Sequence, residues 1–228
     1  MPEAGILAMG GAPLPGLCAH MLELTGKTDP RVCCLGQATG DTADTLVRFY
    51  DLFPSERCRP SHVSLFGIPR PDYREHLLAQ DAIFVGGGNT ANMLAIWRVH
   101  GLDVLLREAW EAGIVVGGVS AGAICWFDAG VTDSFRVELD CLDCLGFLAG
   151  SCCPHYDGEA QRRPAYHRLV GEGAPAGLAL DDGVAAVFAG TELSDVVTTR
   201  PEARAYRIEM VDGEVRETAL DARPLGDS

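Results

Sequence analysis

Apolar and polar residues alternate in blocks along the first half of the chain. Five short apolar runs, each bounded by Gly, Pro or polar residues, are separated by stretches with helical periodicity. Apolar runs with little polar alternation are typical of strands buried on both faces of a parallel sheet. The predicted strands are residues 5–9, 31–35, 63–67, 82–85 and 114–119, and the predicted helices are residues 41–52, 71–79, 90–99 and 102–112.

This repetition of strand and helix predicts an α/β fold, a three-layer sandwich with a mostly parallel sheet, in a single domain over residues 1–228. Residues 128–164 break the pattern: they are rich in Cys, Gly and Asp and predict loops over one end of the sheet. The remaining predictions are a helix at 165–170, strands at 178–180 and 184–188, a hairpin at 203–216 turning at Asp212-Gly213, and a frayed tail from Ala222.

The strongest motif is Gly118-Val119-Ser120-Ala121-Gly122, between a predicted strand and a predicted helix at 123–127. A G-x-S-x-G turn of this kind is too tight for side chains on either flank, and it exposes the serine oxygen at the carboxyl edge of the sheet. The alternative is a Gly-rich turn whose serine caps the helix. The strand–turn–helix context favours a nucleophile elbow with Ser120 as the nucleophile.

A second Gly-rich turn, Gly86-Gly87-Gly88-Asn89, also ends a predicted strand and opens a helix. Its glycines allow close backbone approach and expose N–H groups. The Lys-Ser/Thr pair of a phosphate-binding P-loop is missing, which argues against a nucleotide site. We interpret the turn as half of an oxyanion hole, with donors from Gly88 and Ala121, and Asn89 as a candidate substrate contact. A turn without a chemical role is the alternative.

A serine nucleophile needs a base and a carboxylate that orients the base. His155 follows Pro154 in a loop, where an imidazole can be held firmly toward a cleft, although a loop histidine is often only a structural hydrogen-bond partner. Two acids are candidates: Asp182 at a strand end, and Asp133, which is closer to the elbow. Either aspartate is also of the type that forms turns by bonding its own backbone.

These three motifs, in this order and spacing, resemble peptidase E, the aspartyl dipeptidase family of serine peptidases, with cyanophycinase as a more distant relative. The likeness runs from about residue 82 to residue 186. It implies a class I glutamine amidotransferase-like (flavodoxin-like) fold with serine in place of cysteine. It also implies cleavage of dipeptides that begin with aspartate, without a metal or other cofactor. Ser120 and His155 match the nucleophile and base of the family.

The resemblance leaves the acid open. Peptidase E carries an aspartate after the elbow helix, where this chain has Asp133, whereas the glutamate of cyanophycinase falls in the segment with Asp182, which we favour. The arginine that recognises the aspartate of the substrate falls near Arg162 and Arg163. An arginine fork pairs well with a carboxylate, and a solvated charge pair opening a helix is the alternative. Residues 123–127 depart from the peptidase E pattern, which indicates a separate branch and leaves the strict preference for N-terminal aspartate open.

Composition limits the partners. The net charge of −14, without a basic run, argues against nucleic acid and anionic membranes. The resemblance implies a small peptide as the partner, and a homo-oligomer is allowed. An export signal and a long apolar span are not recognised, which predicts a cytoplasmic protein with reduced thiols. Cys141 and Cys144 have a zinc-ligand spacing, but Cys152, Cys153 and His155 do not repeat it, so we predict incidental thiols and no metal.

Three functions are compatible with these observations. The first is a serine exopeptidase acting on dipeptides or short peptides through a Ser-His-acid triad. The second is a related hydrolase with a different peptide-end or amide specificity. The third is a catalytically silent binding protein of the same fold.

Overall fold

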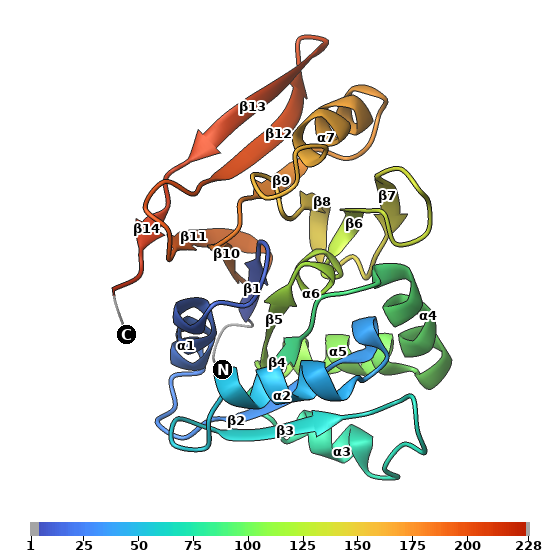
Figure 1. The fold of residues 1–228 in the computed structure, drawn as a ribbon, viewed down its shortest axis with the longest axis vertical. Helices are drawn as coiled ribbons and strands as arrows, with labels where there is room; N and C mark the ends of the chain where they lie inside the picture. Colours follow the sequence, from blue (N-terminus) through green and yellow to red (C-terminus); the bar gives the residue numbers. More distant parts are fainter. Residues whose placement is uncertain (1–4, 227–228) are drawn as a thin grey trace.

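The structure, a computed structural model, describes residues 5–226 and contains two β-sheets with helices around them (Figure 1). The first sheet has eight strands. In spatial order these are β14 (Arg223–Pro224), β11 (Glu192–Thr198), β10 (Val184–Ala189), β1 (Gly5–Met9), β5 (Val115–Val119), β4 (Ala82–Val85), β2 (Arg31–Leu35) and β3 (Arg59–Val63). Strands β1, β5, β4, β2 and β3 are mutually parallel, and β10 joins β1 in the antiparallel direction.

Helices cover both faces of this first sheet. They are α1 (Pro15–Leu24), the short 3-10 turn η1 (Gln37–Thr39), α2 (Ala43–Leu52), α3 (Tyr73–Leu78), α4 (Thr90–His100) and α5 (Leu102–Glu111). In β1, Ile6 and Ala8 pack in the core with α4 and α5, whereas Leu7 and Met9 pack in the core with α1 and α2. Successive strand residues point to opposite faces, so a strand between two helical layers must be apolar at every position. This confirms the predicted α/β class and the layers around its sheet.

The second sheet has six strands and was not predicted from the sequence. In spatial order the strands are β13 (Glu214–Leu220), β12 (Ala205–Val211), β9 (Gly177–Leu180), β8 (Leu148–Cys153), β6 (Phe127–Thr132) and β7 (Asp140–Asp143). The single-turn helix α6 (Ala121–Ile124) leads from β5 into β6, and α7 (Arg162–Gly171) packs against this sheet. Figure 1 shows β12, β13 and α7 at one end of the molecule, opposite β3 and α3.

The prediction of loops over residues 128–164 is therefore wrong. Strands β6, β7 and β8 and the start of α7 occupy the segment. Its buried apolar residues, such as Val131 and Leu148, are interrupted by Gly130, Ser151 and Cys152, so they do not form a recognisable apolar run. The predicted helix at 123–127 is also wrong, because α6 ends after one turn and Phe127 begins β6.

Other elements lie close to their predicted positions. Strands β1, β2 and β4 have the predicted bounds, and the C-terminal hairpin turns at Asp212-Gly213, where both residues have positive φ. The third strand is Arg59–Val63 rather than 63–67: it is an edge strand, where polar residues and Pro60 are tolerated. Helix α1 and strand β11 were not predicted, and the tail expected to fray contributes β14, which pairs with β11. Within residues 5–226, every helix is too short or too polar to cross a membrane.

An ionic cluster around Asp81 ties the amino-terminal ends of β2 and β4 together. The Asp81 carboxylate is 7% exposed and accepts hydrogen bonds from Lys27 Nζ at 2.6 Å and from the Arg31 backbone N–H at 2.8 Å. Burial by itself would raise the pKa of Asp81, but the hydrogen bonds from Arg31 and Lys27 outweigh it and lower the pKa from 3.8 to about 2. A carboxyl with a lowered pKa in the folded state stabilises the protein above its unfolded pKa, and this contribution is lost as the pH falls toward 2.

We therefore expect Asp81→Asn to lower the free energy of unfolding by about 2 kcal/mol at pH 7. The difference from the unchanged protein should shrink as the pH falls from about 4 toward 2, because Asp81 becomes protonated there. Urea unfolding at several pH values measures both effects. Asp51→Asn, an exposed α2 position, is the control; equal stability of the two variants at pH 7 would contradict this account.

Candidate active site

Ser120 occupies a strained turn between β5 and α6. Its φ of 54° and ψ of −110° lie outside the regions that residues with side chains usually adopt. The flanking Gly118 and Gly122 both lie against the carbonyl oxygen of Val85 at the end of β4, and a Cβ atom at either position would overlap that oxygen. The backbone geometry is thus that of the predicted elbow, and both glycines are required by close packing rather than by flexibility.

Two unpaired backbone donors form a candidate oxyanion site beside Ser120. Gly88 has a φ of 137°, and a Cβ atom there would overlap the carbonyl oxygen of Ala38, so the turn after β4 admits only glycine. Within the described chain, the N–H groups of Gly88 and Ala121 donate to no acceptor. These are the two groups that the motifs predicted as oxyanion donors.

His155 reaches Ser120 from the second sheet. It follows Pro154 directly after β8, and its Nε2 lies 3.0 Å from Ser120 Oγ. Its backbone has a φ of 55°, another positive value in a residue with a side chain. The neighbouring Tyr156 N–H donates to the carbonyl of Leu180, which fixes the loop to the end of β9. The imidazole is 22% exposed, so it is held in place but remains accessible from the cleft.

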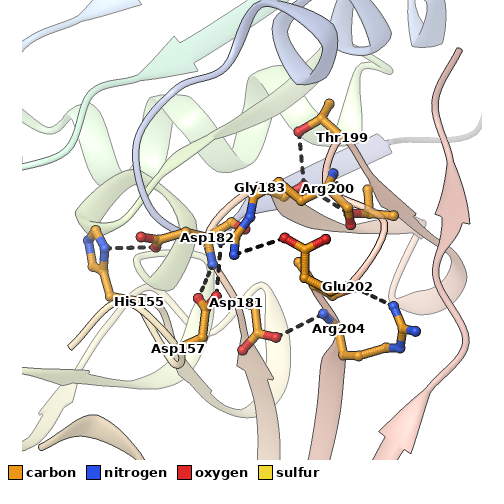
Figure 2. Close-up of polar contacts among 11 residues, drawn as sticks. His155, Asp157, Asp181, Asp182, Gly183, Thr199, Arg200, Glu202 and Arg204 are labelled. Carbon is orange, nitrogen blue, oxygen red and sulfur yellow. Dashed lines mark hydrogen bonds and ion pairs between the residues drawn. The ribbon is translucent and has the colours of Figure 1, made fainter. Parts of the chain in front are cut away.

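Of the two candidate acids, Asp182 is the one beside His155. Its Oδ1 lies 3.1 Å from His155 Nδ1, a contact drawn as a dashed line in Figure 2, whereas Asp133 makes no hydrogen bond to the imidazole. Gly11 and Gly158 line the Asp182 carboxylate closely, because a Cβ atom at either glycine would overlap it. The preceding Asp181 is buried and accepts a hydrogen bond from the Arg204 N–H, and burial raises the pKa of its carboxyl.

An arginine that was not predicted from the sequence holds the backbone of Asp182. Arg200 Nη1 donates to the Asp182 carbonyl at 2.9 Å and to Asp157 Oδ2 at 3.0 Å, while Asp157 Oδ1 accepts from the Asp182 N–H at 2.7 Å (Figure 2). Arg200 and Asp157 thus bind the carbonyl and the N–H of Asp182. Asp157 therefore contacts the backbone of Asp182 rather than the side chain of His155. No local motif marks Arg200, since its role arises only in the folded chain.

Two cavities meet at Ser120, and Gly88, Ser120 and His155 line both of them. The larger, of about 290 Å³, we call the apolar cavity; its larger lining side chains are Pro13, Arg48, Phe49, Leu52, Phe84 and Val119. The smaller, of about 190 Å³, we call the polar cavity; its polar and charged lining side chains are Thr90, Thr132, Asp133, Glu159 and Arg162. Ser120 therefore lines two chemically different compartments.

The predicted substrate-binding residues have different positions. Arg162 is buried in the wall of the polar cavity, where its Nε donates to Glu159 at 2.8 Å and its Nη1 to the Val131 carbonyl at 2.9 Å. Arg163 lies elsewhere: its guanidinium is 4.8 Å from the ring centroid of Tyr156 and pairs with Glu217.

The side chain of Asn89 forms hydrogen bonds that hold two segments of the protein together. Its side chain caps α4 by accepting the Asn92 N–H at 2.8 Å, and its Nδ2 donates to the Ser134 carbonyl at 2.9 Å. Ser134 in turn accepts the N–H of Ala91. These bonds fix the loop after β6 to the start of α4, so Asn89 shapes the wall beside the polar cavity without lining it.

The cysteines form no recognisable metal site. All nine thiols are free, and within residues 5–226 no three His, Cys, Asp or Glu side chains are arranged to hold a metal ion. Cys141 and Cys144 are half-buried, whereas Cys152 and Cys153 are fully buried. Burial raises the pKa of Cys152 and of Cys125, the latter just after α6, well above the ordinary thiol value. Such thiols are poor nucleophiles at neutral pH.

The comparison with known protein families shows to which family the chain belongs. The model of peptidase family S51 matches residues 6–196, a range that includes both Gly-rich turns, His155 and Asp182. The chain belongs to peptidase family S51. This agrees with the resemblance to peptidase E, and it makes the protein a peptidase.

Individual relatives also support the assignment of the chain to a peptidase family. The uncharacterized peptidase YgaJ of Bacillus subtilis (strain 168) is 46% identical, over 97% of this chain and 99% of its own length. Peptidase E of Shewanella amazonensis is 34% identical over 44% of each chain. Among solved structures, a peptidase from an acI-B1 actinobacterium superposes with a TM-score of 0.70, at 16% identity, over 96% of this chain and 95% of that one. This last similarity shows that the fold is shared.

The contact between Gly118 and Val85 can be tested by adding one methyl group. We expect Gly118→Ala to lower the free energy of unfolding by more than about 3 kcal/mol, because the Cβ atom would displace the backbone of β4 in a fully packed sheet. Urea unfolding measures this loss, and failure to recover folded protein would be its extreme form. Gly67→Ala is the matched control, since a Cβ atom there meets no atom within 4 Å. Similar stability of both variants would contradict the proposed packing constraint.

Proposed function

We propose that this family S51 member is a serine peptidase of the peptidase E type in which Ser120, His155 and Asp182 form the catalytic triad. The observation that carries the proposal is the continuous chain of contacts at the junction of the two cavities, 3.0 Å from Ser120 Oγ to His155 Nε2 and 3.1 Å from His155 Nδ1 to Asp182 Oδ1. Both distances are within the range for hydrogen bonds between a nucleophile, its base and an orienting acid.

The reaction follows from this arrangement. Ser120 Oγ attacks the carbonyl carbon of the scissile amide while His155 Nε2 accepts the hydroxyl proton, and the free N–H groups of Gly88 and Ala121 stabilise the negative oxygen that forms. His155 then returns the proton to the leaving nitrogen as the C–N bond breaks, which leaves an acyl ester on Ser120. Water gives a proton to His155 and attacks the ester carbon; as the bond from that carbon to Ser120 Oγ breaks, His155 returns the proton to Oγ, which releases the acid and restores the serine. Asp182 stabilises the transient imidazolium and sets its tautomer.

The polar cavity supports a short peptide with N-terminal aspartate as the substrate. Such a residue carries an ammonium group and a carboxylate on adjacent carbons. The cavity offers Arg162 for the carboxylate, with its Nη2 unpaired among the described residues, and Asp133 and Glu159 for the ammonium. A charge-assisted bond to an arginine in a buried wall is worth more than one in water, which would favour aspartate over neutral residues.

The architecture around Ser120 supports the finer fold assignment. Ser120 follows β5, which lies between β1 and β4 in a set of five parallel strands, with α1 and α2 on one face and α4 and α5 on the other. We assign this part of the molecule to the class I glutamine amidotransferase-like arrangement, with serine at the nucleophile position and the second sheet supplying the base.

Ser120→Ala tests the nucleophile. We expect the unchanged protein to hydrolyse aspartyl-leucine, to act poorly on leucyl-leucine and to leave N-acetyl-aspartyl-leucine intact, since acetylation removes the ammonium. Ser120→Ala should lower kcat by about 10⁴-fold or more, because the acyl ester can no longer form. Ser55→Ala, at an exposed loop position, is the control. Inability of the unchanged protein to cleave any of these peptides, or full turnover by Ser120→Ala, would refute the proposal.

The two acids are separated by a pair of isosteric changes. Asp182→Asn should lower kcat by about 10³- to 10⁴-fold with little change in KM, because the amide cannot stabilise the imidazolium. Asp133→Asn should mainly raise KM, because Asp133 lines the polar cavity and does not touch His155. Steady-state kinetics with aspartyl-leucine distinguish these results. If Asp133→Asn lost most of its kcat while Asp182→Asn kept a near-normal kcat, Asp133 rather than Asp182 would be the acid of the triad.

A further inference from the structure

We infer that Arg48 binds the free C-terminal carboxylate of the substrate, and that the apolar cavity holds the side chain of the leaving residue. This inference rests on the proposed function, since it concerns the second residue of a peptide cleaved at Ser120. It would make the protein a dipeptidase selective for apolar second residues, with Arg48 as a specificity residue.

One face of helix α2 forms a wall of the apolar cavity. The residues of α2 that line the cavity are Thr45, Arg48, Phe49 and Leu52, which have the i, i+3, i+4, i+7 spacing of a single helix face. Phe49 is buried against the sheet, while Arg48 is exposed at the opening. The face therefore presents apolar side chains inside the cavity and one cation at its edge.

The charge on Arg48 is not neutralised within the described chain. No Asp or Glu lines the apolar cavity, and Arg48 makes no ion pair or hydrogen bond with any of residues 5–226. Arginines such as Arg31 and Arg200 pair with aspartates, and among the arginines of the described chain that have no ion pair, Arg48 is the one that lines this cavity. An unpaired guanidinium at the rim of an apolar cavity is suited to a ligand with an apolar body and one anionic group.

The difference between the cavities orients the substrate. The polar cavity combines Arg162 with two carboxylates, which suits a residue bearing both an ammonium and a carboxylate. The apolar cavity combines several apolar side chains with one cation, which suits a residue with an apolar side chain and a terminal carboxylate. In a dipeptide that carboxylate is on the carbon bonded to the leaving nitrogen, so it stays close to Ser120 and His155. In a longer peptide or a dipeptide amide, the carbon bonded to the leaving nitrogen carries no free carboxylate, so Arg48 would have no charged partner there.

The test compares three substrates: aspartyl-leucine, its C-terminal amide and aspartyl-glycine. For the unchanged protein we expect kcat/KM to be about tenfold higher for the acid than for the amide, a modest factor because Arg48 is exposed. We also expect kcat/KM for aspartyl-leucine to exceed that for aspartyl-glycine by about tenfold, because the leucine side chain is buried in the cavity.

Arg48→Gln should abolish the preference for the acid over the amide, by raising KM for aspartyl-leucine about tenfold and leaving the kinetics on the amide unchanged. Arg48→Lys should keep part of the preference, because it keeps the charge. Arg57→Gln, which removes the same charge from an exposed arginine outside the cavity, should behave as the unchanged protein.

The outcomes separate this inference from the function on which it rests. Equal cleavage of acid and amide by the unchanged protein would overturn the role of Arg48 and leave the serine peptidase intact. The same holds if Arg48→Gln keeps the preference. Absence of cleavage of all three substrates would instead refute the proposed function, and the inference with it. Equal cleavage of acid and amide by the unchanged protein is sufficient to overturn the inference, so the test can fail without relying on the folding of any variant.

Discussion

The carbonyl oxygen of Val85 occupies the space that a side chain at position 118 or 122, two residues before or after Ser120, would need. This contact between β4 and the turn after β5 is the constraint on which the site depends. It permits only glycine at positions 118 and 122, holds Ser120 in a conformation that is costly for a residue with a side chain, and brings the end of β4 against Ser120. The Gly86–Gly88 turn leaves that same strand end, so one packing contact sets both the serine and an unpaired N–H beside it.

The second sheet completes the site because its strands end at the same place. His155 follows β8, and Asp182 lies between β9 and β10, where the chain crosses from the second sheet to the first and β10 pairs with β1. The Gly10 N–H donates to the Val184 carbonyl at this crossing, and the Arg200–Asp157 pair grips the backbone of Asp182. The imidazole is therefore positioned by the junction of the two sheets, and no segment near His155 in the sequence could have supplied its partner.

Features that depend on local rules could be predicted from the sequence. A strand between two helical layers must be apolar throughout, so β1, β2 and β4 could be located to the residue, and the glycines of the elbow marked a close approach. Strands β6 and β8 were missed because glycine, threonine, serine and cysteine interrupt their buried apolar residues, and such mixed segments give a weak periodic signal. Ser120 and His155 stood out by motif. The choice between Asp133 and Asp182 depended on a contact between distant segments, which only the structure contains.

The arginines also show the difference between features set by local sequence and features set by contacts between distant segments. Arg162 and Arg163 are adjacent and were indistinguishable in sequence, yet one is buried beside Ser120 and the other stacks on Tyr156 and pairs with Glu217. Arg48 carried no motif, because what distinguishes it is a position in the lining of the apolar cavity together with the absence of a carboxylate partner in the described chain. A charge left unpaired on the rim of a cavity is a property of the whole fold: every acidic residue must be located before it can be recognised. Specificity is thus harder to predict from sequence than the nucleophile, whose strained backbone requires glycines that mark its position.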